Sequence, residues 1–260
     1  MKRKQVIWWA GILASLLFTA GLQALKANPA FQQQIQGANT SYQNGNFEDA
    51  LEKYLSVYEA GMEAPELLLN LGNTYFKLND IPSAILFYER ALRLAPRDED
   101  IRFNLGLAQS RIIDKIEEVP QVFFVRWWHM LRDSLSIRQW ARLSLAGLLL
   151  TLTFTAIYLI SRRLLVKQLF FWVALISMAV TLHAILFAHQ QKTNSINKPE
   201  AIIFTPTINV KSSPDIGSTD IFVIHEGTKV RITDNIGDWL EIRIPSGSKG
   251  WIKTTDLRKI

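Results

Sequence analysis

The sequence predicts a multidomain membrane protein that combines an α-helical repeat array, a two-helix transmembrane hairpin and a C-terminal all-β barrel. Three observations support this fold class: a 34-residue repeat in the first half, two long apolar segments in the second, and short alternating apolar and polar runs over residues 201–260. The 260-residue chain contains no cysteine, which excludes disulfides, thiolate zinc sites and cysteine nucleophiles.

Residues 1–27 predict an export segment. A basic start precedes an apolar stretch at residues 6–22, the pattern of a secretory signal peptide or an N-terminal anchor. Cleavage near Ala24 or Ala27 would place a leucine where the processing enzyme prefers a small residue. A cleaved signal and an uncleaved anchor therefore both stay open, and either one exports the repeat region behind it.

Residues 31–118 predict the helical array. Four positions recur after 34 residues: Gly45, Phe47, Ala50 and Tyr54 reappear as Asn79, Ile81, Ala84 and Tyr88. This period is typical of stacked helical hairpins, which bury their apolar faces against one another and present a concave surface. We expect one hairpin at 31–64, a second at 65–98 and a capping half-repeat at 99–118.

The next segment predicts an interfacial helix followed by a membrane hairpin. Residues 120–142 alternate aromatic side chains with arginine, as amphipathic helices at a membrane surface do. Segments 143–161 and 168–189 are apolar, and about 20 residues cross one hydrocarbon core. Ser136 is expected to be the N-cap of the first span. The short connection places both outer flanks on the same side of the membrane.

The charge distribution favours a membrane rather than a nucleic acid. Residues 120–200 hold 9 Lys or Arg against 2 Asp or Glu, whereas residues 28–119 hold 8 against 14. Arg162, Arg163 and Lys167 between the spans predict a cytoplasmic loop, and hence periplasmic repeat and barrel domains. The four arginines before the first span favour the opposite placement, but an interfacial helix can hold arginine on anionic lipid from either side.

After an expected linker at 190–200, residues 201–260 predict the barrel. Six short apolar runs are separated by turn residues, the pattern of a small all-β domain.

Two families resemble these parts. The array resembles tetratricopeptide repeats through residues at their signature places, namely Leu71, Gly72, Tyr75, Ala84, Tyr88, Ala91 and Pro96. Asn79 stands where that family usually has glycine. The last 60 residues resemble a bacterial SH3 domain through the segments Asn209–Pro214, Glu226–Thr228, Gly237–Trp239, Gly250–Ile252 and Asp256–Leu257.

The whole order of parts resembles the BatE-type proteins, the tetratricopeptide members of the Bacteroides aerotolerance (Bat) group. The aromatic and basic segment before the first span adds to this resemblance. It implies a scaffold role in tolerance of oxygen or envelope stress. Implied partners are membrane proteins with von Willebrand A domains and a cytoplasmic MoxR-type ATPase.

The tetratricopeptide resemblance implies a partner-binding groove lined by the first helix of each hairpin. The candidate groove residues are Asn39, Tyr42, Gln43, Leu69, Asn73, Phe76, Lys77, Phe103 and Arg111. Amides together with aromatic rings suit an extended peptide, because amides bond its backbone and rings cover its side chains. The alternative is that Asn73, like Asn70, belongs to the ordinary repeat consensus and makes no partner contact.

In the barrel, Trp239 and Trp251 either line a groove for a peptide or glycan or belong to the core. His183 lies in the second span, where an ionisable residue suggests function; the alternative is a neutral histidine bonded to Thr153 or Thr155 of the other helix. No metal-ligand spacing, nucleophile elbow or phosphate-binding loop is present. We therefore expect a binding protein rather than an enzyme, with no cofactor and no metal.

Two functions remain. The first is a membrane-anchored periplasmic scaffold that binds proteins through the repeat groove and the barrel. The second is a cell-wall-binding module in which the barrel recognises peptidoglycan and the repeats act as a spacer.

Overall fold

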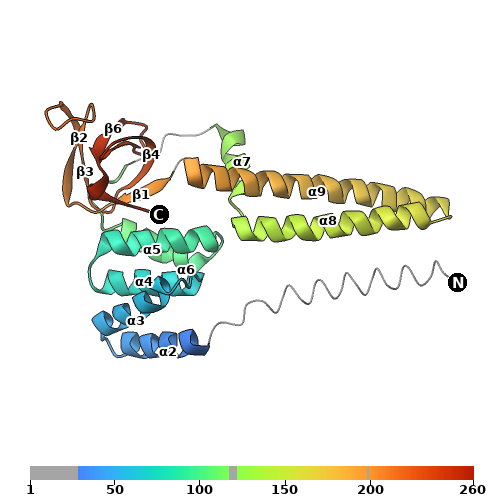
Figure 1. Cartoon of the computed structure of the whole chain (residues 1–260), viewed down its shortest axis with the longest axis horizontal. Helices are drawn as coiled ribbons and strands as arrows, with labels where there is room; N and C mark the ends of the chain where they lie inside the picture. The colour runs from blue at the N-terminus through green and yellow to red at the C-terminus, as the bar shows by residue number, and fades with distance from the viewer. Residues whose placement is uncertain (1–28, 117–121, 198) are drawn as a thin grey trace.

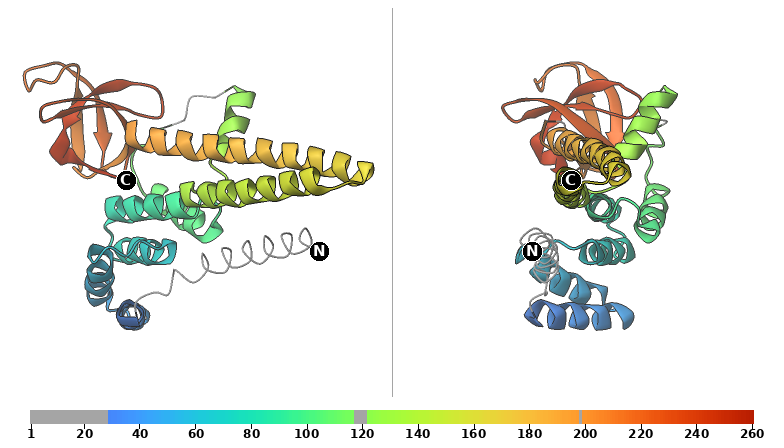
Figure 2. Two further views of the ribbon diagram at one scale, coloured as in Figure 1. Left: turned by 45° about the vertical axis from the view of Figure 1, so that its right-hand side comes forward. Right: turned by 90° about the vertical axis from the view of Figure 1, so that its right-hand side faces the viewer.

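The computed structural model describes residues 29–116, 122–197 and 199–260. The predicted export segment at 1–27 lies outside these residues. Figure 1 shows three parts: a stack of helices, a long pair of helices and a curved sheet. Figure 2 shows the long pair extending as an arm away from the other two.

The stack is the predicted repeat array. Its helices are α2 (Pro29–Gln43), α3 (Phe47–Glu59), α4 (Pro65–Lys77), α5 (Ile81–Leu94) and α6 (Glu99–Gln109). The 34-residue period is visible in the backbone: the turns after α2 and α4 hold Gly45 at φ +81° and Asn79 at φ +62°. Asparagine tolerates this left-handed conformation better than most residues, which explains why it replaces glycine there.

Glycine at position 72 is required by packing between α4 and α5. A Cβ atom there would lie 2.5 Å from the ring of Tyr88. The equivalent Gly106 of α6 has open space around it, because no further helix follows in the stack. Tyr54, Leu71, Ala84 and Tyr88 are fully buried, as expected for the core of the array.

The second part contains α7 (Phe123–Arg132), α8 (Ile137–Ile160) and α9 (Leu164–Asn197). The predicted interfacial helix at 120–142 is shorter than expected, because residues 137–142 belong to α8. Ser136 starts α8 with a capping box: its Oγ accepts from the Gln139 N–H, and the Gln139 side chain accepts from the Ser136 N–H at 2.8 Å. The prediction that Ser136 caps this helix is confirmed.

The expected linker at 190–200 is wrong over most of its length. Helix α9 continues to Asn197, since neither glycine nor proline interrupts the sequence before Pro199. Both helices are therefore longer than the predicted segments 143–161 and 168–189.

Small and hydroxyl side chains join α8 to α9. Gly147 lies directly against Thr181, and Ser177 Oγ donates to the Gly147 carbonyl at 3.2 Å. Thr151 and Ser177 bond across the pair at 3.0 Å. Small residues let helix backbones approach closely, as in membrane helix pairs. Only 6% and 11% of the two apolar windows is buried, and by length and composition both helices could cross a membrane.

The third part is an antiparallel seven-stranded sheet. Its strands are β1 (Glu200–Ile203), β2 (Thr207–Lys211), β3 (Asp220–His225), β4 (Lys229–Ile236), β5 (Trp239–Arg243), β6 (Lys249–Lys253) and β7 (Leu257–Lys259). They pair in the order β3-β2-β6-β5-β4-β1-β7. The alternation of the sequence matches burial, with Ile208 and Val210 of β2 and Leu240 and Ile242 of β5 inside.

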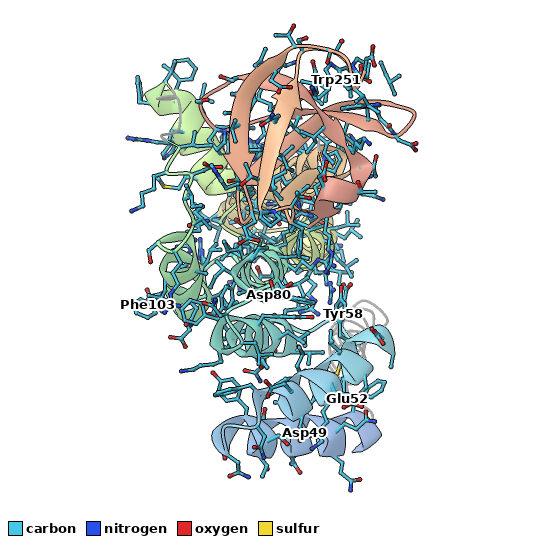
Figure 3. All side chains as sticks on the ribbon, turned by 90° about the vertical axis from the view of Figure 1, so that its left-hand side faces the viewer. Asp49, Glu52, Tyr58, Asp80, Phe103 and Trp251 are labelled. Carbon is cyan, nitrogen blue, oxygen red and sulfur yellow. The ribbon has the colours of Figure 1, made fainter. Side chains whose placement is uncertain are left out.

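The sheet packs against α5 of the array. Figure 3 shows the array from another side, with the sheet above α5, the helix that begins next to the labelled Asp80. Ile202 of β1 is fully buried among the core residues of the array, and Phe204 and Ile260 pack at the edge of the same cluster. Conversely, Ile116 from the segment after α6 packs against the core of the sheet. Each of the two parts therefore places apolar side chains against the core of the other.

Candidate protein-binding face

An asparagine from each first helix pairs with a tyrosine from the next helix. The Tyr54 hydroxyl donates to the Asn39 side-chain carbonyl at 2.6 Å, and the Tyr88 hydroxyl donates to that of Asn73 at 2.8 Å. Burial raises the pKa of Tyr54 to about 12 and that of Tyr88 still further, so both remain neutral donors. The bonds repeat with the 34-residue period and orient both amides.

Because of these bonds, the asparagines can have a structural role in the repeat and still contact a partner. Asn39 and Asn73 serve the repeat structure, as the consensus alternative requires. However, each amide is used only through its oxygen in the tyrosine bond. Asn70 donates to Asn39 at 3.4 Å, and this adds a third amide to the same stretch of the array surface.

The aromatic candidates lie on the same helices. Tyr42 is half-buried and meets Phe47 edge to face, with ring centroids 5.3 Å apart. The Arg111 guanidinium stacks over the Phe76 ring at 4.5 Å, so two predicted groove residues from α4 and the end of α6 are in direct contact. A cation–π pair of this kind adds about 0.5–1 kcal/mol at an exposed site.

Helix α6 exposes the largest apolar side chains of the array. The Phe103 side chain is 72% exposed and that of Leu107 is 42% exposed. They are four residues apart, so they lie on one face of the helix, and Figure 3 shows Phe103 pointing away from the stack. Leu107 was missed from the sequence, although it stands 34 residues after the candidate Asn73.

The remaining candidates lie on α2 and α4. Gln43 and Lys77 are exposed at the last positions of these two helices, and Leu69 is half-buried in α4.

A different part of the array surface, on α5, is already occupied by the barrel. Glu89 of α5 has a side chain only 9% exposed and accepts from Lys229 Nζ at 2.9 Å. Lys229 also contacts Glu200 at 3.0 Å, and Arg93 lies 3.6 Å from Glu200. Burial would raise the pKa of Glu200, but Lys229, Arg93 and Arg231 hold it below its ordinary value. Conversely, Glu89 and Glu200 outweigh burial and raise the pKa of Lys229.

A second polar contact holds the segment after α6 to the barrel. The Asp114 carboxylate accepts from the His225 backbone N–H at 2.7 Å, from Thr228 Oγ1 at 2.7 Å and from His225 Nδ1 at 2.8 Å. Partial burial would raise the pKa of Asp114, but these bonds keep it below its ordinary value. Backbone carbonyls complete the contact: Arg90 donates to Lys259 O and Arg93 to Ile260 O, each at 2.7 Å.

The sequence carried no signal for this docking surface. Glu89 and Lys229 are 140 residues apart and Asp114 and His225 are 111 apart, and single charged residues in helices and strands are usually solvated.

The two barrel tryptophans share the outer face of the sheet. Trp239 pairs with Lys253 and Glu241 pairs with Trp251 across β5 and β6, so the rings are diagonal neighbours on one face. The core residues Leu240 and Ile252 point the other way. Both tryptophans are half-buried. Figure 3 shows Trp251 at the end of the barrel far from the array, which leaves that face free for a ligand.

The interpretation of His183 as bonded to Thr153 or Thr155 is wrong. Its Nδ1 lies 2.8 Å from the Ala179 carbonyl of its own helix, and the side chain is exposed on α9. The face of α9 that meets α8 is instead occupied by Ser177 and Thr181. Among residues 29–116, 122–197 and 199–260, no three His, Cys, Asp or Glu side chains cluster as a metal site would require.

Models of known families match both the helical array and the barrel. The model of the tetratricopeptide repeat matches residues 65–98, and that of the bacterial SH3 domain matches residues 206–258. The chain therefore carries a tetratricopeptide repeat, a module of protein–protein interaction, and a bacterial SH3 domain.

Two curated proteins are similar over short stretches. "BBSome complex member BBS4" of Bos taurus is 38% identical over 84 residues, which cover 32% of this chain and 16% of that protein. "Putative N-acetylmuramoyl-L-alanine amidase YrvJ" of Bacillus subtilis (strain 168) is 36% identical over 53 residues, which cover 20% of this chain and 10% of that protein. The chain thus spans only a small fraction of either relative.

Proposed function

We propose that this protein is a membrane-anchored periplasmic scaffold, and not an enzyme, that holds a partner protein on the concave face of its repeat array. The observation that carries the proposal is the contrast between the two sides of the array. The barrel covers α5, while α6 presents Phe103 and Leu107 to solvent. Exposed apolar patches on otherwise polar domains mark interaction sites.

The chemistry of this face suits an extended segment of a partner protein. Oriented amides at Asn39 and Asn73 can bond a peptide backbone, and Phe76 and Phe103 can cover its side chains. Lys77 and Arg111 add positive charge next to the rings. We therefore expect a partner segment with apolar side chains and at least one acidic group.

The anchor is the hairpin of α8 and α9. Both helices are long, apolar and almost wholly exposed, so lipid is the solvent that suits them. The array precedes α8 and the barrel follows α9, and their contact requires both to lie on one side of the membrane. The three basic residues at the opposite end favour the periplasm for the soluble parts.

The order of parts also supports membership of a Bat aerotolerance or envelope-stress complex. In that setting the partners would be membrane proteins with von Willebrand A domains, and a MoxR-type ATPase would act on the complex from the cytoplasm. The similarity to a protein named as a complex member agrees with an assembly role.

A site-specific crosslink tests the scaffold. A photoreactive amino acid at Phe103 should capture a von Willebrand A membrane protein in irradiated cells, and Phe103→Ala with Leu107→Ala should prevent co-purification. Ile113, which is 70% exposed but lies beyond α6, is the matched control site. Capture from Ile113 and none from Phe103 would contradict a partner on the concave face.

Cysteine labelling tests the membrane topology independently, and it has no background because the sequence contains no cysteine. Single cysteines replace Lys253 on the barrel or Arg163 between α8 and α9. In spheroplasts an impermeant maleimide should label the first and spare the second. The reverse pattern would place the array and the barrel in the cytoplasm.

The second candidate is a cell-wall-binding module. It is favoured by the similarity to a protein named as an N-acetylmuramoyl-L-alanine amidase and by the two tryptophans on the free face of the barrel. The full-length protein should then sediment with purified sacculi, and Trp239→Ala with Trp251→Ala should abolish this. Sedimentation that survives both changes would remove the tryptophan face from consideration.

A further inference from the structure

A cavity lies where the array, the barrel and the apolar hairpin meet. It has a volume of about 830 Å³ and is lined from α5, α6, α7, the start of α8, the end of α9, β1 and β4. Figure 1 shows why these elements converge: α7 stands beside the end of α9 that leads into the barrel, and α5 runs below it. We call this space the junction cavity.

The junction cavity has an excess of positive charge. Its basic lining residues are Arg93, Arg102, His129, Arg132, Lys229 and Arg231. The acidic lining residues are Glu89, Asp133 and Glu200. Five Lys or Arg against three Asp or Glu leave a surplus of two charges before His129 is considered.

The carboxylates of the cavity are already engaged. Glu89 and Glu200 bind Lys229 at 2.9 and 3.0 Å, and Arg132 forms a fork with Asp133 at 2.6 and 2.7 Å. Arg231 lies 3.7 Å from Glu200, which it shares with Lys229.

Arg102 is the least neutralised cation of the cavity. Within the described part of the chain it makes no ion pair, and its guanidinium donates to the Pro96 carbonyl. Arg102 is therefore the charge most available to an incoming anion, and Arg231, which has only a long contact with the shared Glu200, is the next.

Side-chain contacts hold in place the wall of the cavity that adjoins the apolar hairpin. Gln191 donates to the Leu135 carbonyl at 2.9 Å, and Trp140 donates to the Arg132 carbonyl at 2.8 Å. Trp128 and Trp140 both pack edge to face on Phe187 at 5.0 Å. These contacts fix α7, and with it His129 and Arg132, to the ends of α8 and α9.

In the proposed membrane anchoring, the cavity would lie at the depth of the lipid headgroups. Beside it, α7 exposes Phe123, Phe124, Trp127 and Met130, each at least 59% exposed. Such a face rests at the boundary between headgroups and acyl chains. Leu135 and Ile137 line the wall of the cavity next to the apolar hairpin, so an acyl chain could continue from the basic end along α8.

We propose that the junction cavity binds the phosphate of an anionic phospholipid headgroup. Guanidinium groups match phosphate oxygens in charge and geometry, and basic pockets beside membrane helices are typical headgroup sites. A lipid is favoured over a soluble phosphate because one wall is apolar and continuous with the hairpin. The inference rests on the proposed membrane anchoring, but not on the identity of the partner protein.

Headgroup binding would fix the orientation of the scaffold. Arg102 belongs to the array and Arg231 to the barrel, so a phosphate held by both would join these two parts. The concave face with Phe103 would then be held at a defined angle to the membrane.

The test uses the full-length protein in nanodiscs of phosphatidylcholine, with and without phosphatidylglycerol, and counts retained lipids by native mass spectrometry. Wild type should retain phosphatidylglycerol and unfold at a higher temperature in its presence. Arg102→Gln with Arg231→Gln should retain it at least about tenfold less, because losing even one charge-assisted hydrogen bond costs about that factor. Arg97→Gln with Arg243→Gln removes the same charge from exposed sites outside the cavity and should behave as wild type.

Three results would overturn the proposal. Equal retention by the cavity variant and wild type would remove the cavity as the site. An equal loss of lipid retention in the control variant would show that retention depends only on the net charge of the protein. Stabilisation by soluble glycerol phosphate in phosphatidylcholine nanodiscs would replace the lipid with a soluble ligand. If the proposed membrane anchoring is itself wrong, alkaline washing will release wild type from native membranes. This result distinguishes a failure of the anchoring from a failure of the cavity as a lipid site.

Discussion

Helices α5 and α6 follow one another in the same array, yet their environments differ. In α5 every residue from Pro82 to Glu89 is buried, whereas in α6 only Ile101, Leu105 and Ala108 are. Burial of α5 has three causes: its hairpin partner α4, the following helix α6 and the docked barrel. The array therefore uses one side for internal docking and leaves the other for a partner.

The two sides also differ in chemistry. The docked side combines an apolar contact around Ile202 with the buried pair of Glu89 and Lys229. The open side combines exposed rings with amides. Changes on the docked side should therefore alter stability, and changes on the open side should alter binding alone.

The largest effect is expected from Lys229→Ala. This change leaves Glu89 and Glu200 without their shared cation in a contact where both are largely buried. We expect a loss of about 3 kcal/mol, at the lower end of the range for a broken buried pair because a third of Lys229 stays exposed. Denaturant unfolding measures it. Lys249→Ala, which breaks an exposed pair with Glu241, is the control and should cost less than about 1 kcal/mol.

A similar but smaller effect is expected from Gly227→Ala. A new Cβ would lie 2.5 Å from Ile112 Cγ2, so the barrel would be pushed away from the array. We expect a loss of about 2–3 kcal/mol from overpacking and backbone strain together. Gly237 also has a positive φ but open space around it, so Gly237→Ala should lose only the backbone contribution of about 1 kcal/mol. Equal losses would show that Ile112 does not contact the barrel in solution.

Acid should weaken the docked side. Glu200 and Asp114 have pKa values below their ordinary 4.5 and 3.8. A depressed pKa adds stability above the ordinary value, and this is lost as the pH falls through the pKa of the folded state. Hydrogen exchange of α5 should therefore rise below about pH 4.5. Glu200→Gln with Asp114→Asn should flatten this dependence, and an unchanged profile in that variant would assign it to other carboxyls.

The smallest stability effect is expected on the open side. Phe103→Ala should change the free energy of unfolding by no more than about 0.5 kcal/mol, as exposed positions usually do. Thermal unfolding checks this, with Leu105→Ala as the contrasting buried position of the same helix. A large loss at Phe103 would mean that this ring packs inside the protein and is not free for a partner.

Much of the fold was predictable because its signals are local. The period that relates Tyr54 to Tyr88, the hydroxyl at Ser136 before an apolar helix, and the alternation around Val210 each depend on neighbours within one or two elements. Errors arose at boundaries: α9 runs through the expected linker, and α8 begins before the expected span. A helix can continue into polar sequence until a residue that disfavours it, such as the proline after α9, is reached, and hydropathy does not report that.

The candidate site was predicted in part. Phe76 and Arg111 meet as expected for one face, but the bonds from Tyr54 and Tyr88 to the two asparagines could not be read from spacing alone. Leu107 was missed although its repeat position was available.

The repeat, the two apolar helices, the strands and the turn residues could be predicted from the chain alone, because each depends on residues close in sequence. The docking of the barrel on α5, the contact of Glu89 with Lys229, and the presence of Arg102 and Arg231 in one cavity emerge only in three dimensions. These contacts join residues more than a hundred positions apart. Their partners are chosen by shape and charge in three dimensions, which no local pattern records.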